Sequence, residues 1–392
     1  FEKFPKGLKK HEKLVRLIQK TSHFSPTAQN EVHFLKNGKI TFETIFEALE
    51  AAESFIHLQY YIFEDGELAD RLLSLFEDKI NKGVVIRLIY DGVGSFSLTK
   101  SYLIKLKGIG VEVFPFLPFK FGRFLRSLNY RNHRKIIVVD NKFAFTGGIN
   151  VSDKYLKGDP NLGKWHDMHL KIEGPAVSHL NSIFLWDWRL VSEQPIDASV
   201  ESKSNVSESG KAMVQIVANG PDDDFPAIEQ VYFSIIGQAQ HYLYITNPYI
   251  IPGHAIMTAL ETAALSGIDV RLLLSAKNDS RLVNWSVRSY FEPLLKAGAK
   301  IHLFPEGFLH SKIMISDDSI ASVGTANIDV RSFEQNYEVN AIIYDTDFAE
   351  ALKEDFLNDS GKSQEITYAE HMKRPWLDKL KEGAAKVFSP VL

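Results

Sequence analysis

Two segments of the chain repeat the same reactive side chains at the same spacing. Residues 132–150 read NHRKIIVVDNKFAFTGGIN, and residues 309–327 read LHSKIMISDDSIASVGTAN. Both contain a His, a Lys two positions later, an Asp seven later, a Gly fourteen later and an Asn seventeen later. A chance second match at five positions has odds of roughly one in ten thousand, given residue frequencies near one in twenty. The repetition favours a functional role over two unrelated core strands.

His, Lys and Asn together are suited to phosphate chemistry. Side chains two positions apart in an extended segment share a face, so the His and Lys of each motif should project together. Positive charge and N–H donors for a phosphate would come from Lys135, Lys312, Asn150 and Asn327. Of His133 and His310, one would attack phosphorus and the other would protonate the leaving oxygen. A pKa near the reference value of about 6.5 suits either role, and the repeat does not tell which His attacks.

Asp140 and Asp317 complete the repeated catalytic motif but stand at an odd spacing from their His. We therefore expect these carboxylates to fix a turn or to bind backbone N–H groups, without touching the reacting group. The Gly147-Gly148 and Gly324-Thr325 turns should return the chain, so that the motif asparagines approach the same site.

A metal site is the main alternative, because His is the commonest metal ligand. The residue that shares each His face is Lys, however, and its positive charge would repel a metal ion. The chain also lacks Cys. His166 and His169, which flank Asp167, are interpreted as structural. The sequence therefore predicts neither a metal nor another cofactor.

The elements that carry the motifs are repeated as well. Residues 42–63 resemble 227–250, residues 81–92 resemble 265–276, and residues 108–115 resemble 298–305. Helical patterns alternate there with short apolar strands, which predicts an α/β fold with a covered sheet. We expect two similar α/β/α-layered domains related by a pseudo-two-fold axis. The motif strands would meet at the interface and form the active site there.

The predicted organisation is an N-terminal basic segment (1–30), a first domain (31–198), a Ser-rich linker (199–211) and a second domain (212–392). In the basic segment, Leu14, Leu17 and Ile18 recur at helical spacing. This pattern predicts either a helix that lies on a membrane surface or one that packs on the first domain.

The composition is that of a globular protein, with 392 residues and a net charge of -4, which argues against a protein that coats nucleic acid. No apolar run approaches the roughly 20 residues of a spanning helix. The chain begins with Phe1 and not with Met, which suggests a trimmed chain. We therefore expect that a membrane segment preceded it.

An insertion at residues 116–132 combines aromatic and basic side chains. We expect it to touch an anionic bilayer beside the active site, through Phe119, Phe121, Arg123, Phe124 and Arg126. The alternatives are a loop that packs on the protein and a surface that binds single-stranded nucleic acid.

Longer stretches resemble one known family. The repeated H-x-K-x4-D followed by G-G/T-x-N is similar to the motif of the phospholipase D superfamily. Further segments resemble bacterial cardiolipin synthases, namely YYIFEDGELADRLL, GVVIRLIYDGVGS, RNHRKIIVVD, FTGGINVSDKY, WHDMHLKIEGPAV and SVGTANIDVRSFEQNYEVNAIIYD. The resemblance extends from about residue 30 to the SPVL terminus.

The resemblance implies a two-step phosphatidyl transfer. His133 would attack a phospholipid phosphodiester to give a phosphatidyl-histidine. His310 would protonate the departing alcohol and then deprotonate the incoming one. Asp167 would orient His310 across the interface and Glu338 would orient His133, since a carboxylate on the second ring nitrogen fixes the tautomer.

In this family the donor and the acceptor are both phosphatidylglycerol, and the products are cardiolipin and glycerol. We therefore expect a monomeric phosphatidyltransferase, associated with the bacterial cell membrane and without a nucleic acid partner. Three alternatives stay open: a phospholipase D that forms phosphatidic acid, a nuclease of the same superfamily, and a silent lipid-binding module.

Overall fold

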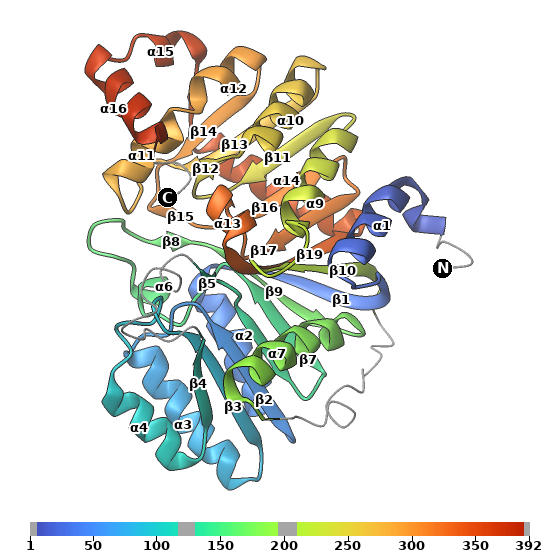
Figure 1. The fold of residues 1–392 in the computed structure, drawn as a ribbon, viewed down its shortest axis with the longest axis vertical. Coiled ribbons are helices and arrows are strands. Elements are labelled where there is room, and N and C mark those ends of the chain that lie inside the picture. Colours follow the sequence, from blue (N-terminus) through green and yellow to red (C-terminus); the bar gives the residue numbers. More distant parts are fainter. Residues whose placement is uncertain (1–5, 117–129, 195–209, 388–392) are drawn as a thin grey trace.

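The computed structural model describes residues 6–116, 130–194 and 210–387, and one continuous 16-stranded sheet runs through both halves of the chain (Figure 1). From one edge, the first half supplies β4 (Glu112–Phe116), β3 (Val85–Asp91), β2 (Phe55–Tyr60), β6 (Ile136–Val139), β7 (Phe143–Gly147), β9 (Met168–Glu173) and β1 (Thr27–Lys36). The second half continues with β10 (Ala212–Asn219), β19 (Asn336–Tyr344), β17 (Ile320–Gly324), β16 (Ile313–Ser316), β11 (Tyr242–Thr246), β13 (Asp269–Ser275), β14 (Lys300–Phe304) and β20 (Gln364–Ile366). The sixteenth strand, β5 (Arg131–Asn132), pairs with β19 outside this order.

The strand order of the second half reverses that of the first. β2, β3 and β4 are parallel neighbours, as are β11, β13 and β14. β6, β7 and β9 are antiparallel neighbours, as are β16, β17 and β19. At the centre β1 and β10 pair antiparallel, with Thr27 opposite Val214. A reversed order about an antiparallel central pair is what a two-fold rotation produces. The predicted pair of α/β/α-layered halves is confirmed.

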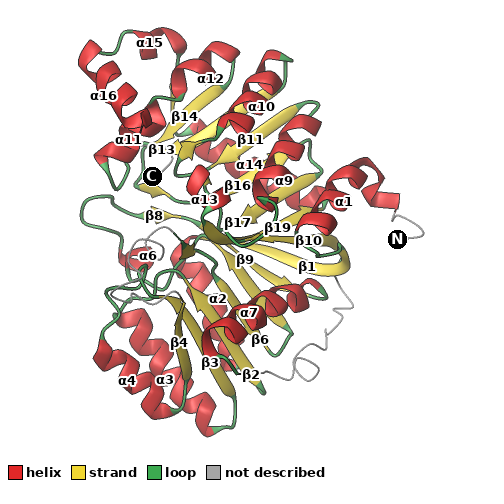
Figure 2. Ribbon diagram, in the orientation of Figure 1, coloured by secondary structure: helices red, strands yellow, loops and turns green. Residues whose placement is uncertain are grey.

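Helices cover both faces of the sheet (Figure 2). In the first half, α2 (Asn37–Glu50), α3 (Glu67–Asn81) and α4 (Lys100–Ile109) pack on one face. In the second half, the same layer is formed by α9 (Ala227–Gln238), α10 (His254–Leu265) and α12 (Phe291–Ala297). α7 (Ala176–Ser192) and α14 (Thr346–Gly361) share a core over the central strands. This cover explains why the motif strands read IIVV and IMIS, since strands buried on both faces are continuously apolar.

The N-terminal helix α1 (Glu12–Thr21), which follows the 3-10 helix η1 (Lys6–His11), packs on the second half. Leu14, Val15 and Ile18 are fully buried in the core that contains α9 and α10. Gln215 of β10 fixes the segment by donating to the Val15 carbonyl. The expected packing on the first domain is therefore wrong, and the apolar face of α1 is not available to a membrane.

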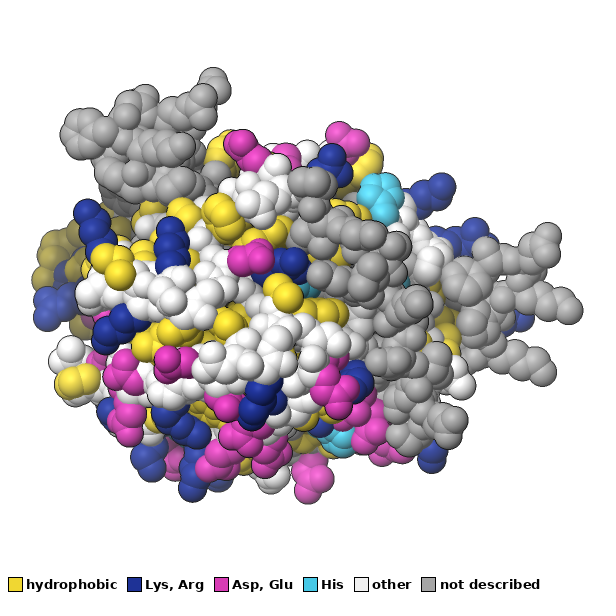
Figure 3. Space-filling model, turned by 90° about the horizontal axis from the view of Figure 1, so that it is seen from below, with side chains coloured by type: hydrophobic (Ala, Val, Ile, Leu, Met, Phe, Trp, Pro, Cys, Tyr) yellow, Lys and Arg dark blue, Asp and Glu magenta, His cyan; other side chains and the backbone are white. Residues whose placement is uncertain are grey.

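The remaining elements are short or lie at the periphery. They are β5 (Arg131–Asn132), β8 (Trp165–His166), β12 (Ile250–Ile251), β15 (Phe308–Leu309), β18 (Ile328–Asp329), α6 (Lys154–Lys157), α11 (Arg281–Arg288), α13 (Val330–Glu334), α15 (Tyr368–Met372) and α16 (Trp376–Val387). The linker up to residue 209 and the predicted membrane contacts Phe119, Phe121, Arg123, Phe124 and Arg126 lie outside the described residues. On the face seen in Figure 3, acidic and basic side chains are interspersed.

Candidate active site

The two motif histidines reach one site because short strands cross between the halves. The motif strands themselves do not meet as predicted, since six strands separate β6 from β16 in the sheet. Instead β5, just before the first motif, pairs with the start of β19 in the second half. β15, just before the second motif, pairs with β8 in the first half. Each half thus extends the segment before its motif into the other half. The histidines converge through these short strands and not through the motif strands.

His133 lies against a carboxylate of the opposite half. Its backbone N–H donates to the Tyr337 carbonyl of β19 at 2.9 Å. One residue further along β19, the Glu338 carboxylate lies 3.0 Å from His133 Nδ1. Thr325 donates its hydroxyl to the same Glu338 oxygen at 2.5 Å, so the carboxylate is fixed from two sides. His133 therefore presents Nε2 as the ring nitrogen that can meet a substrate.

His310 has the reciprocal arrangement. Its backbone N–H donates to the His166 carbonyl of β8 at 2.7 Å. The Asp167 carboxylate, on the next residue, lies 2.7 Å from His310 Nδ1. Two dyads, each made of one residue from each half, are thus related by the internal symmetry. The sequence placed both carboxylates beside these histidines through the family resemblance alone.

Both histidines line one cavity of about 370 Å³. Asn150 and Asn327 line it too, so the two motif asparagines lie where the sequence predicted. Asn150 accepts a hydrogen bond from the Ile62 N–H through Oδ1 and donates to the Tyr155 hydroxyl through Nδ2. The cavity wall also contains aromatic rings, namely Tyr61, Trp165, Tyr249 and Phe308. Sequence reasoning missed these rings, since their strands and loops carry no repeated signal.

The motif lysines lie behind the histidines and do not line the cavity. Lys135 is fully buried and donates to the His133 carbonyl at 2.7 Å; Lys312 is likewise buried and donates to the His310 carbonyl. Burial lowers the pKa of Lys135 to about 7 and that of Lys312 to about 8. The charge of Lys312 also lowers the pKa of Lys135, as expected of two ammonium groups that converge on one site. A phosphate in the cavity would raise both pKa values.

The motif aspartates lie at the far ends of their strands, away from the cavity. Asp140 accepts hydrogen bonds from the backbone N–H groups of Glu53, Ser54 and Phe55, which precede or begin β2. Asp317 accepts from the equivalent N–H groups before and at the start of β11. The structure thus matches the turn-fixing role expected from their odd spacing, and it does not bring these two members of the catalytic motif to the reacting group.

Burial sets the protonation of both histidines. It lowers the pKa of His133 to about 4, against the opposing charge of Glu338. Burial and the neighbouring Lys312 lower the pKa of His310 to about 4. Burial opposes ionisation of Asp167, but His310 and Lys312 hold the pKa of its carboxyl below the usual value. Each dyad therefore favours a neutral imidazole beside a carboxylate, and burial holds the pKa of both histidines below the expected value of about 6.5.

Glycines allow the dyads to form. A Cβ on Gly148 would lie 2.0 Å from Asp167 Oδ1, so any side chain there would displace the carboxylate. The preceding Gly147 has a φ of 148°, a conformation that favours glycine. In the second copy Gly324 lies against Asn340, whose side-chain oxygen accepts from Thr325 N–H at 3.1 Å. The Gly-Gly and Gly-Thr turns of the motif are thus explained by close packing.

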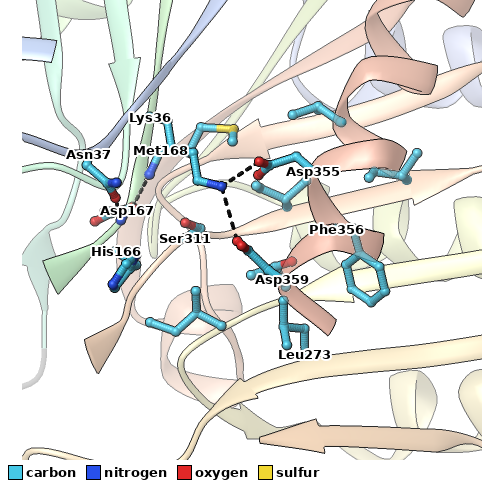
Figure 4. A pocket seen from close by; sticks show the side chains of 15 residues that line it. Lys36, Asn37, His166, Asp167, Met168, Leu273, Ser311, Asp355, Phe356 and Asp359 are labelled. Atoms are coloured by element: carbon cyan, nitrogen blue, oxygen red, sulfur yellow. Dashed lines mark hydrogen bonds and ion pairs between the residues drawn. The ribbon is translucent and has the colours of Figure 1, made fainter. Parts of the chain in front are cut away.

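A second, much smaller cavity lies behind the Asp167 dyad (Figure 4). Asn37 begins α2 and holds Asp167 from this side, since its N–H donates to the Asp167 carbonyl at 2.8 Å. The adjacent Lys36 crosses to the second half, where its ammonium contacts Asp355 at 2.5 Å and Asp359 at 3.3 Å. An ion bridge between the halves therefore adjoins the residue that positions the catalytic dyad.

No metal site was found among the residues that the structure describes. His166 packs its ring against Phe304, and His169 is buried beside Ile149 N–H. These contacts fit a structural role for His166 in β8 and for His169 in β9.

Comparisons with known proteins identify the family of the chain. Residues 45–188 and 232–360 match the family model described as "Cardiolipin synthase, PLD-like domain". A cardiolipin synthase of Geobacillus sp. is 42% identical over all of this chain and 78% of its own length. Cardiolipin synthase 2 of Bacillus anthracis is also 42% identical, over all of this chain and 76% of its own length.

Among solved structures, a phosphatidylserine synthase of Haemophilus influenzae superposes with a TM-score of 0.72 over 98% of this chain and 100% of its own. Its identity is 16%, so it supports the fold alone. The family model and the near relatives extend over both repeated halves, including both dyads. The chain belongs to the cardiolipin synthase family of phospholipase D-like proteins.

Proposed function

We propose that the protein transfers a phosphatidyl group between two phosphatidylglycerol molecules, forming cardiolipin and glycerol through a phospho-histidine. One observation carries the proposal: two His–carboxylate dyads, each shared between the halves, line a single cavity. Two imidazoles on one phosphate permit attack and leaving-group protonation at the same centre. The relatives named cardiolipin synthase supply the substrate class.

In the first step, His133 Nε2 forms a bond to the phosphorus of the donor and the bond from phosphorus to the glycerol oxygen breaks. His310 Nε2 gives its proton to that oxygen, and glycerol leaves. In the second step, the hydroxyl of the acceptor gives its proton to His310 while its oxygen bonds to phosphorus. The bond between phosphorus and His133 then breaks, which restores the enzyme. The choice of His133 as the nucleophile rests on the family resemblance.

The electrostatics of the site suit this division. A neutral imidazole has a lone pair for attack, and burial keeps His133 neutral. The acid must hold a proton, and Asp167 stabilises the protonated His310 at a distance of 2.7 Å. A bound phosphodiester would add a negative charge near both rings and raise the pKa of His310 from its lowered value. Binding of the substrate would therefore favour the protonated form of His310, which its role as the acid requires.

The buried lysines complete the anion site from behind. Because they donate to the histidine carbonyls, they hold the main chain that carries each ring. Their charges favour an anion in the cavity although their ammonium groups do not reach its surface. Donors that do line the cavity include the side-chain amides of Asn150 and Asn327. We propose these four residues as the phosphate-binding set.

The protein would act at the surface of the bacterial membrane, where its lipid substrates are. Among the described residues, no helix is long and apolar enough to cross a bilayer. Contact with the bilayer by the insertion at 116–132 and action as a monomer both stay predictions.

Hydrolysis by water is the second candidate function, because the same dyads would serve it. Incubation with phosphatidylglycerol vesicles and identification of the lipid products decides between the two. Cardiolipin with an equal amount of glycerol supports the transferase; phosphatidic acid as the main product would contradict it. A nuclease is less well supported, because the relatives that match the whole chain are named cardiolipin synthases and an exposed face carries interspersed charges (Figure 3).

A further inference from the structure

Two arginines in the active-site cavity have no part in the two-step transfer. Arg131 belongs to β5, two residues before His133, and Arg331 belongs to α13, which follows the second motif asparagine. Both side chains line the same cavity as the two histidines. The donor phosphate is already served by the dyads, the lysines and the asparagines. The arginines therefore call for an explanation of their own.

The charge of Arg331 acts on Arg131 in the cavity that both residues line. Burial and the charge of Arg331 both lower the pKa of Arg131, while Asp91 partly compensates. The Asp91 carboxylate itself accepts three backbone N–H groups, those of Val93, Gly94 and Asn132. Arg331 is half-buried, and no ion pair is found for it within the described part of the chain. Two guanidinium groups in this relation would be stabilised by an anion between them.

Two carboxylates that line the cavity with Arg331 accept hydrogen bonds from other groups. Asp329 is buried and accepts the Ser332 N–H at 2.6 Å, as the N-cap of α13. Asp279 accepts the Tyr249 hydroxyl at 2.8 Å. Neither forms an ion pair with Arg331 among the contacts of the described residues. The charge of Arg331 also acts on the Asp329 carboxylate, but its guanidinium N–H groups form no ion pair there.

An unused acceptor lies in the same wall. Asn336 Oδ1 is buried, and no hydrogen-bond partner is found for it in the described structure. Its amide nitrogen donates to Glu338 at 3.2 Å, which fixes the orientation of the side chain. A buried acceptor without a partner is costly unless a ligand hydroxyl donates to it. The wall thus combines guanidinium groups with a site for a hydroxyl.

We propose that Arg131 and Arg331 bind the phosphate of the acceptor phosphatidylglycerol, with Asn336 accepting from its glycerol. This inference rests on the proposed function and names the feature that selects the acceptor. The acceptor differs from water and from glycerol in having its own phosphodiester, three carbons away from the hydroxyl that attacks. That second anion must lie in the cavity while the first phosphorus is still bonded to His133. A second set of cations in the same cavity meets this requirement.

The test follows the partition of the phosphatidyl-enzyme between two soluble acceptors. The native protein receives phosphatidylglycerol as the donor, together with glycerol and the methyl ester of glycerol phosphate, each with a different isotopic label. The second acceptor is the phosphatidylglycerol head group without its acyl chains. The ratio of the two labelled lipid products is independent of the first step and of the fraction of folded enzyme.

The variant Arg331→Gln should lower that ratio about ten- to a hundred-fold, the worth of a charge-assisted hydrogen bond. Arg331→Lys keeps the charge but not the forked donor geometry. Its product ratio should lie between that of Arg331→Gln and that of the native protein. The matched control is Arg189→Gln, which removes an exposed arginine from α7, outside the cavity wall. The control should leave the ratio at the native value.

An unchanged ratio in Arg331→Gln would overturn the inference. A loss of transfer to both acceptors by the same factor would also overturn it, because it would assign Arg331 to the donor phosphate. If the native protein forms phosphatidic acid and labels neither acceptor, the proposed function itself fails, and the inference falls with it.

Discussion

The Asp167 carboxylate of the first half lies 2.7 Å from His310 Nδ1 of the second half. This distance ties the catalytic competence of one repeat to the strand ends of the other. The reciprocal contact between Glu338 and His133, at 3.0 Å, has the same consequence in the opposite direction. Neither half of the chain can form a complete dyad by itself.

Replacing Asp167 with Asn should lower the rate of turnover about 10- to 100-fold, the usual cost of losing the partner of a functional His. The amide has the same shape but no charge to stabilise protonated His310. The loss should be larger at the optimum pH of the native protein than at lower pH, where protonation is easier. Steady-state rates on phosphatidylglycerol vesicles between pH 5 and 8 measure this. Asp78→Asn, at an exposed ion pair, is the control. A loss that does not vary with pH would contradict the orienting role.

Replacing His133 with Ala should abolish both turnover and the acid-labile phospho-enzyme. The enzyme is quenched after mixing with labelled lipid, and the label bound to protein is counted. Near-normal transfer by this variant would show that His133 is not the nucleophile.

Replacing His310 with Ala should cost about 3–5 kcal/mol in the first step with a natural lipid, the usual worth of a general acid. The cost should shrink for a phospholipid with an activated aryl leaving group, which needs no proton. Release of the aryl alcohol in the first turnover is compared with release of glycerol. Equal losses on both substrates would exclude the acid role of His310.

A methyl group at Gly148 should impair catalysis more than stability. In Gly148→Ala the new Cβ would meet Asp167 Oδ1 at 2.0 Å, which pushes the carboxylate away from His310. We expect at least a ten-fold loss of rate, because small displacements of catalytic groups are costly. Gly237→Ala on α9 is the matched control, since its Cβ would meet nothing within 4 Å. Equal rates for the two variants would show that the turn tolerates the methyl group.

The ion bridge of Lys36 should contribute to the stability of the joined halves. Lys36→Met leaves Asp355 and Asp359 together without their cation, in a partly buried place. We expect a loss of about 1–3 kcal/mol in the free energy of unfolding, between the values for exposed and for buried pairs. Lys82→Met, at the exposed pair with Asp78, should cost less than about 0.5 kcal/mol. Denaturant titrations of both variants test the difference.

Acid should destabilise the protein through its buried imidazoles. Burial lowers the pKa of His57 to about 3, with its ring between Asn181 and Arg87. In the unfolded state the pKa of this imidazole is about 6.5, so between pH 3 and pH 6.5 the unfolded state binds more protons than the folded state. This stabilisation is complete above pH 6.5 and is lost as the pH falls toward 3. In His57→Gln, the free energy of unfolding should vary less steeply with pH between 6 and 4.5. A slope equal to that of the native protein would refute the assignment.

The sequence by itself determined the repeat, the α/β layering and the residues of the two motifs. These follow from local signals: hydrophobic period, glycine turns and the spacing of His, Lys and Asn along single segments. The odd spacing of Asp140 and Asp317 likewise predicted that they bind backbone, because side-chain direction in an extended segment depends only on position. The family resemblance added the two carboxylates.

Only the tertiary structure decided how the halves share the site. The crossing pairs β5–β19 and β8–β15 depend on contacts between residues about 150–200 positions apart, which leave no local pattern. The packing of α1 on the second half was missed for the same reason, since an apolar stripe does not name its partner. Burial by both halves also lowers the pKa of His133 and of His310 below the value of about 6.5 that the sequence analysis assumed. Local patterns fix which side chains are present, and long-range packing fixes what surrounds them.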